Sequence, residues 1–181
     1  MPTLINSLNE LRDELLDDQE PIESQDDLGI AIQVQLNFGR LTDFVKNELS
    51  ELSPIQKIFY DALVYSETIF ELYSEIAFDG LESIFYNKTG NDIDKLRTVL
   101  HDNKSPISEL FDKAYSLVDE LFDIKPNENW VMRNLDKNPY ETLSDDVINS
   151  IESIANQIYE MQNQVDRLAF EKALNMARQT S

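Results

Sequence analysis

Apolar residues in this chain recur at intervals of three and four positions, which is the repeat of a helix face and differs from the alternation of a strand. Only four glycines and six prolines interrupt the 181 residues, so these repeats continue over long stretches. Hydrophobic residues make up 41% of the chain, which is enough for a core that hides roughly 70% of the unfolded chain's surface. The sequence therefore predicts an all-α fold, a single-domain multi-helix bundle over residues 1–181.

Turn and capping residues divide this pattern into separate helices. An acidic N-terminal helix is expected within residues 1–27, and a second helical region at about residues 26–49. Ser53 before Pro54 is a helix-start signal, and the helix that follows is expected to reach about Ala77. A short helix between turns at Asp79-Gly80 and Thr89-Gly90-Asn91, and helices at residues 92–100 and 106–122, complete this part.

Two of these helices have a clear apolar face. The first helix carries a stripe of leucines, namely Leu4, Leu8, Leu11 and Leu15. The helix after Ser53 is expected to turn six residues to the core, namely Ile58, Ala62, Tyr65, Ile69, Leu72 and Ile76. Residues 124–143 contain two prolines and four asparagines, and we expect an irregular segment held to the core by Trp130 and Val131.

A long C-terminal helix is expected from the capping residue Ser144 to about Arg178. Its apolar residues are spaced alternately four and three apart, as in a coiled coil: Val147, Ile151, Ile154, Ile158, Met161, Val165 and Leu168. Such a seam requires a partner helix. We expect a helix of the same chain to provide it, and a homodimer formed through this helix is the alternative.

The chain is strongly acidic, with 35 Asp and Glu against 15 Lys and Arg, a net charge of -20. An excess of this size opposes the compact state by self-repulsion, and we favour a basic protein partner as its explanation. Direct binding to nucleic acid is not expected, because nucleic-acid readers neutralise phosphates with Lys and Arg. Anionic membranes would also repel the chain. Its first residues lack the basic and apolar regions of a signal peptide, so a cytoplasmic protein is expected.

Two segments hold most of the excess charge. Residues 1–27 contain nine acids and one base, and residues 54–86 contain six acids and one base. In the second segment Glu67, Glu71 and Glu75 follow at intervals of four, which places their carboxylates along one side of a helix about 6 Å apart. This spacing resembles that of successive phosphates on a nucleic-acid strand. No Lys or Arg lies between Lys57 and Lys88 in the sequence to relieve the row.

The candidate partner-binding residues are the acidic side chains of these two segments. They are Glu67, Glu71, Glu75, Asp79 and Glu82 in the second segment, and Glu10, Asp13, Glu14, Asp17 and Asp18 in the first helix. The alternative interpretation is a solvated acidic face that serves only solubility.

The residues available for catalysis are few. The chain has one histidine and no cysteine, which excludes disulfides, thiolate nucleophiles and Cys-based metal sites. A lone histidine such as His101, near a helix end, is typical of a surface or capping residue. No Gly-rich phosphate loop, GxSxG elbow or HExxH helix is present, and the acidic segment at residues 17–27 lacks the pattern of a calcium loop. We therefore expect neither an enzyme, nor a cofactor, nor a metal site.

Residues 53–122 resemble the helical bacterial DNA-mimic family to which DNA-mimic protein nineteen belongs. In that family a helix ending in Glu-Val leads into an Asn-Gly-Gly-Phe turn, an aromatic helix, an Asn and a small-residue turn. In this chain Glu75-Ile76 matches the Glu-Val, and Phe78-Asp79-Gly80-Leu81 matches the turn. The aromatic segment and its Asn correspond to Phe85-Tyr86-Asn87, and the closing turn corresponds to Gly90. Phe78 replaces the Asn, and Asp79 replaces the first Gly, a position where Asp tolerates positive φ better than most residues.

This resemblance implies an all-helical protein whose acidic surface imitates the phosphates of DNA and occupies the DNA-binding face of a transcription factor or nucleoid protein. A second hypothesis uses the same charge: an immunity or inhibitor protein that neutralises a basic nuclease toxin through an apolar hot spot. A third is a dimeric helical adaptor whose charge serves only solubility.

Overall fold

The computed structural model describes residues 4–17 and 49–179, and the regular elements in these ranges are helices, which confirms the all-α fold. The second helical region predicted near residues 26–49 falls almost entirely on residues 18–48, outside the described ranges. The chain divides into two compact units: Met1–Phe70 with Asn163–Ser181, and Glu71–Gln162. Helix α4 (Pro54–Asp79) contributes residues to both. The single-domain organisation stays a prediction.

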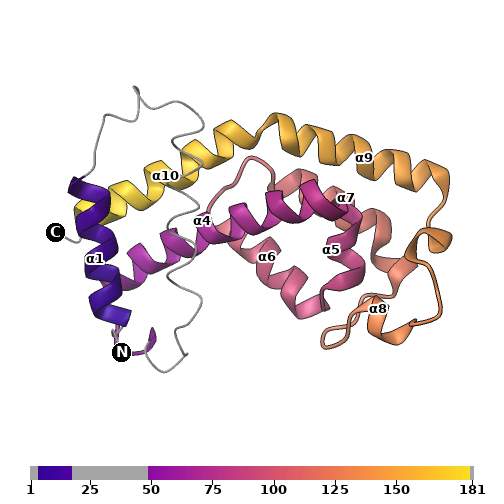
Figure 1. The fold of residues 1–181 in the computed structure, drawn as a ribbon, viewed down its shortest axis with the longest axis horizontal. Coiled ribbons are helices and arrows are strands. Elements are labelled where there is room, and N and C mark those ends of the chain that lie inside the picture. Colours follow the sequence, from indigo (N-terminus) through magenta and orange to yellow (C-terminus); the bar gives the residue numbers. More distant parts are fainter. Residues whose placement is uncertain (1–3, 18–48, 180–181) are drawn as a thin grey trace. The chain divides into compact units, whose positions relative to one another are not determined.

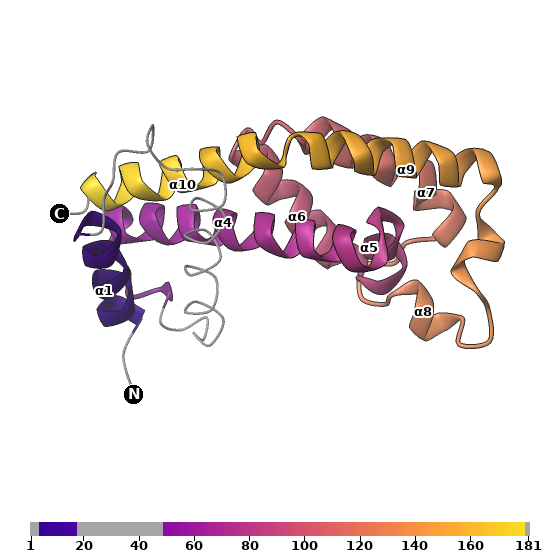
Figure 2. The same ribbon diagram turned by 45° about the horizontal axis from the view of Figure 1, so that its top comes forward.

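The first unit contains α1 (Leu4–Asp17), the first part of α4 and α10 (Gln162–Gln179), which lie side by side in Figures 1 and 2. The predicted leucine stripe of α1 is confirmed for Leu8, Leu11 and Leu15, which are at most 6% exposed. The Ser66 hydroxyl of α4 donates to the Ala169 carbonyl of α10 at 3.5 Å. This contact joins two helices that lie far apart in the sequence.

Helix α4 begins as the sequence predicts. Pro54 is its first residue, and the Ser53 backbone N–H donates to Oε1 of Gln56 while the Gln56 N–H donates to the Ser53 hydroxyl. This reciprocal pair satisfies two of the N–H groups that a helix start leaves without a partner. The observed end at Asp79 lies two residues beyond the expected end at Ala77.

The predicted core face of α4 is correct at five positions and wrong at Ile58. Ala62, Tyr65, Ile69, Leu72 and Ile76 are at most 5% exposed, whereas Ile58 is 52% exposed. Phe59 and Leu63, which are four residues apart on the buried side, are 2% and 0% exposed. Together they bury more apolar surface than Ile58 would, so the helix places them inward and Ile58 outward.

The second unit is built around α7 (Ser108–Phe122), which packs against α5 (Leu81–Asn87), α6 (Gly90–Asp102) and α9 (Asp145–Glu160). Aromatic rings fill its core: the ring centroids of Phe85 and Phe111 are 5.3 Å apart, and those of Phe122 and Trp130 are 5.6 Å apart. These tilted and edge-to-face contacts are the favourable geometry for ring pairs. Figure 2 shows the part of the chain in which α5, α6 and α9 lie next to α7.

The segment between α7 and α9 contains α8 (Trp130–Arg133) and the 3-10 helix η2 (Pro139–Thr142). Trp130 is 6% exposed, which confirms that it holds this segment to the core, while Val131 is only half-buried. The Arg133 guanidinium donates to the backbone carbonyls of Phe122 and Asp123. It thereby satisfies carbonyl groups at the C-terminal end of α7.

The long C-terminal helix is interrupted once. Ser144 caps α9, with its side chain accepting from the Val147 N–H, and the helical stretch extends to Gln179, but Met161 separates α9 from α10. In α9, Ile151, Ile154 and Ile158 are at most 1% exposed, and α7 packs against this helix. For α9 the predicted seam therefore has its partner in the same chain. The homodimer stays an untested alternative.

The turn between α4 and α5 requires glycine. Gly80 has φ 84 and ψ 158, a backbone conformation that is almost restricted to this residue. A Cβ atom at this position would lie 2.7 Å from Oε1 of Glu82. Asp79, which replaces the first Gly of the family motif, ends α4 and does not have positive φ. The residue with positive φ in this turn is therefore Gly80.

Replacing Gly80 by Ala is expected to lower the free energy of unfolding by about 1–3 kcal/mol, because the new Cβ is strained and displaces the Glu82 carboxylate. Urea unfolding followed by circular dichroism measures the change. Asn87→Ala, at the exposed end of α5, is the control and is expected to alter the value by less than about 0.5 kcal/mol. Equal unfolding midpoints for Gly80→Ala and the unchanged chain would contradict this account of the turn.

Candidate partner-binding surface

Four of the predicted carboxylates lie on one continuous stretch of the second unit, where α4 turns into α5. They are Glu71, Glu75, Asp79 and Glu82, and we call them the acidic corner. The first three occupy successive turns of α4 at intervals of about 6 Å, and Glu82 lies in the first turn of α5. Glu71 and Asp79 are exposed, whereas Glu75 and Glu82 are half-buried. The predicted row is therefore present on a folded helix.

The remaining predicted residues belong to the first unit or fall outside the described ranges. Glu67 lies on the first part of α4 and is half-buried. On α1, Glu10, Asp13 and Glu14 are exposed, and the Asp13 carboxylate pairs with the Arg12 guanidinium at 2.7 Å. Asp17 is the last residue of α1, and Asp18 lies outside the described residues.

One base does reach the carboxylates of α4. The Lys88 ammonium, just beyond α5, lies 2.6 Å from Oε1 of Glu75, and both side chains are about one-third exposed. The expectation that the row has no relieving base is therefore wrong at Glu75. The turn at Gly80 is the physical reason, because it reverses the chain and returns the end of α5 to the side of α4. The side-chain carboxylates of Glu71 and Asp79 have no ion-pair or hydrogen-bond partner among the described residues.

Two tyrosines fix the position of Glu82. The Tyr140 hydroxyl, from η2, donates to Oε1 of Glu82 at 3.0 Å, and the rings of Tyr140 and Tyr86 lie edge to face at 6.4 Å. Burial is the main reason that the pKa of Tyr140 lies far above its ordinary value, and the hydrogen bond to Glu82 and the charge of that carboxylate add to it. Burial is also the main reason that the pKa of Tyr86 is raised, and the charges of Glu82 and Asp79 add to it. Both phenols therefore stay neutral, and that of Tyr140 serves as a donor to Glu82.

An exposed aromatic ring lies within the acidic corner, and sequence reasoning did not identify it as a site residue. Phe78 is 87% exposed, more than any other large hydrophobic residue in the described ranges. It is three residues from Glu75 and seven from Glu71, so these side chains share one face of α4. The helix repeat could have predicted that Phe78 is exposed, because Phe78 lies on the opposite side of α4 from the buried residues Leu72, Tyr73 and Ile76.

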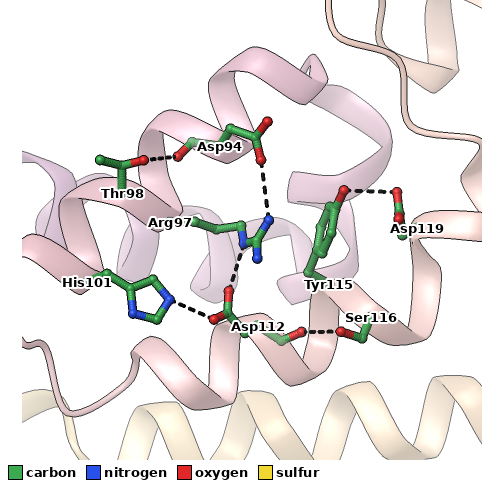
Figure 3. A network of polar contacts seen from close by, with 8 residues as sticks. All are labelled: Asp94, Arg97, Thr98, His101, Asp112, Tyr115, Ser116 and Asp119. Carbon is green, nitrogen blue, oxygen red and sulfur yellow. Dashed lines mark hydrogen bonds and ion pairs between the residues drawn. The ribbon is translucent and has the colours of Figure 1, made fainter.

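The only histidine of the chain belongs to a polar network between α6 and α7 (Figure 3). Its centre is the Asp112 carboxylate, which lies 2.7 Å from Nε of Arg97 and 2.7 Å from Nε2 of His101. Asp94 pairs with Arg97 at 3.3 Å, and the guanidinium lies 4.5 Å from the centre of the Tyr115 ring. Because these contacts join two helices, the network fits a structural link, in agreement with the surface role expected of His101.

The Asp112 carboxylate contacts both Arg97 and His101. Its burial alone would raise the pKa of the carboxyl group, but hydrogen bonds from Arg97 and His101, together with their charges, lower the pKa below its usual 3.8. The ionised form is thus favoured by folding. The resulting stabilisation is fully present above the unfolded-state pKa and is lost as the pH falls through the lowered folded-state pKa.

Replacing Asp112 by Asn is expected to destabilise the chain by about 1 kcal/mol at pH 7, because the substitution removes a partly exposed ion pair with Arg97 and the contact of the carboxylate with His101. The difference should shrink as the pH falls below about 4, where the unchanged chain loses the same interaction. Thermal unfolding from pH 3 to pH 7 measures it. Asp94→Asn is the matched control with the smaller expected effect, since Asp94 is 68% exposed. A pH-independent difference for Asp112→Asn would contradict the assignment.

Among residues 4–17 and 49–179, no three or more His, Asp or Glu side chains gather in an arrangement that could hold a metal ion. In the part of the chain that the structure describes, none of the helices combines the length and the apolar character that a membrane crossing needs.

Comparisons of this chain with protein-family models, curated proteins and solved structures found no match. The resemblance of residues 53–122 to the DNA-mimic family therefore stays a prediction.

Proposed function

We propose that this chain is a non-enzymatic acidic binding protein that imitates the phosphate backbone of DNA and occupies the nucleic-acid-binding face of a basic DNA-binding protein. The observation that carries the proposal is the acidic corner, in which Glu71 and Asp79 present exposed carboxylates from one helix. Glu75 and Glu82 extend this array, each held by an interaction with a neighbour. A transcription factor or nucleoid protein of a bacterial cytoplasm is the proposed partner.

The net charge of -20 supports the proposal on kinetic grounds. An acidic protein attracts a basic one over distances near the screening length, which is about 8 Å at physiological ionic strength. Fixed carboxylates at phosphate-like spacing then meet Lys and Arg side chains that are already arranged for phosphates. Encounter should be fast and should weaken with added salt.

Neutralising the two exposed carboxylates tests the surface directly. Glu71→Gln with Asp79→Asn is expected to weaken binding to the basic partner about tenfold at low salt, as two exposed ion pairs would. The control is Glu152→Gln with Glu160→Gln, which removes the same charge from exposed positions on α9. If both pairs weaken binding equally, general acidity and not the acidic corner would carry the interaction.

The partner is sought in the cell extract fraction that binds DNA-cellulose. Proteins of this fraction are applied to the immobilised full chain, and duplex DNA is then added as the competitor. A partner whose DNA-binding face is occupied should be released by the duplex. Retained proteins that the duplex leaves bound would contradict the mimicry, because their contact surface would lie elsewhere.

The exposed Phe78 favours a second candidate, an inhibitor of a basic nuclease. A buried ring contributes to affinity without depending on salt, and hot spots of tight interfaces are typically aromatic. Binding that survives about 0.5 M salt, where charges are screened within a few ångströms, would favour this candidate. Binding lost at that concentration would favour mimicry through charge alone.

A further inference from the structure

The break between α9 and α10 has no cause in the local sequence. Residues 157–164 contain neither Gly nor Pro, and Glu160, Met161 and Gln162 are all good helix formers. Met161 nevertheless has φ -92 and ψ -1, and its N–H donates to the Ile158 carbonyl, three residues back, at 3.1 Å. An α-helix would bond this N–H to the carbonyl four residues back, so the chain makes a turn of the 3-10 type here. The cause of the break must therefore lie outside the segment.

The Tyr73 hydroxyl of α4 makes a contact that accounts for the break. It donates to the Ile158 carbonyl at 3.0 Å, and the two residues are 4% and 0% exposed. In an uninterrupted helix this carbonyl would accept from the N–H of Gln162. A carbonyl oxygen has two lone pairs, and here the Met161 N–H and the Tyr73 hydroxyl engage both. A side chain that inserts into the ladder of helix hydrogen bonds in this way breaks or bends a helix.

We propose that the Tyr73 hydroxyl is the latch of a two-state joint in the long C-terminal helix. With the hydroxyl bonded to Ile158, the helix is broken at Met161. With the hydroxyl released, the Gln162 N–H takes its place, and α9 and α10 join into one helix. The two states compete closely, because the local sequence favours the continuous helix and a single buried hydrogen bond favours the broken one.

The joint lies where the chain leaves the second unit, which begins at Glu71 and ends at Gln162. Tyr73 is two residues from the first of these positions, and Ile158 is four residues from the second. The latch therefore ties together the two segments by which the chain enters and leaves this unit. None of these residues except Glu71 belongs to the acidic corner, and the inference does not depend on the proposed function.

The latch is in contact with an exposed side chain. The ring of Tyr159, which is 36% exposed, lies with its centroid 6.1 Å from that of Tyr73. Contacts between rings at this distance are favourable and help to fix the orientation of both. Tyr159 is thus the surface residue next to the joint.

Tyr73→Phe tests the proposal, because it removes the hydroxyl and keeps the ring. We expect the Gln162 amide to gain the Ile158 carbonyl as its acceptor and to exchange with solvent about tenfold more slowly. A scalar coupling across the new hydrogen bond should appear between the Gln162 nitrogen and the Ile158 carbonyl carbon. The Cα chemical shift of Met161 should move to its helical value. Nuclear magnetic resonance of the full chain measures all three.

Tyr159→Phe is the matched control, since it removes a phenolic hydroxyl close to the same break and retains the contact between the rings. It is expected to leave the exchange of Gln162 and the shift of Met161 unchanged. Unchanged values in Tyr73→Phe would overturn the proposal, because packing without the hydroxyl would then hold the break. Equal changes in both variants would overturn it as well.

The unchanged chain supplies a second measurement if Tyr73→Phe does not fold, which circular dichroism checks. A latched hydroxyl is buried and hydrogen-bonded, so its proton should exchange slowly enough to give a resonance, with a nuclear Overhauser contact to the Met161 amide proton. A Tyr73 hydroxyl proton in fast exchange with water would overturn the proposal.

Discussion

The turn at Gly80 is the constraint on which the candidate surface depends. Its positive φ allows α4 to end at Asp79 and α5 to begin at Leu81, with a single residue between the two helices. The reversal places the Glu82 carboxylate against the Gly80 backbone and returns Lys88 to Glu75. A residue with a Cβ would disturb this turn and, with it, the Glu82 carboxylate and the pairing of Lys88 with Glu75.

Much of the fold could be predicted from the sequence, because its signals are local. The start of α4 at Pro54 and the cap at Ser144 depend on residues within one turn, and the structure has both. The incorrect predictions concern features that depend on tertiary packing. Ile58 and Phe59 both fit an apolar face, and only packing decides which is buried. The break between α9 and α10 at Met161 could not be predicted, because no Gly or Pro lies near it in the sequence.

The candidate site was predictable in its charges but not in its contacts. The spacing of Glu71, Glu75 and Asp79 follows from the helix repeat, so their common side is a local property. The pairing of Lys88 with Glu75 depends on the angle of a turn, and the bond from Tyr140 to Glu82 joins residues 58 positions apart. Pairings of this kind follow from the folded arrangement, which the order of residues does not reveal directly.

The acidic corner destabilises α4. This cost argues against the interpretation that these carboxylates serve only solubility. Like charges four residues apart destabilise a helix by a few tenths of a kcal/mol per pair, and Glu71, Glu75 and Asp79 form two such pairs, with the Lys88 ammonium as a counter-charge at Glu75, the residue that the pairs share. Asp79 also lies at the negative end of the helix dipole, where α4 has no basic residue in its last turn and where an acid costs roughly 0.3–1 kcal/mol. Solubility could be supplied by carboxylates placed elsewhere, and it does not require an exposed Phe78 beside them. A cationic partner would remove both penalties, because its charges neutralise the row and its surface covers the ring.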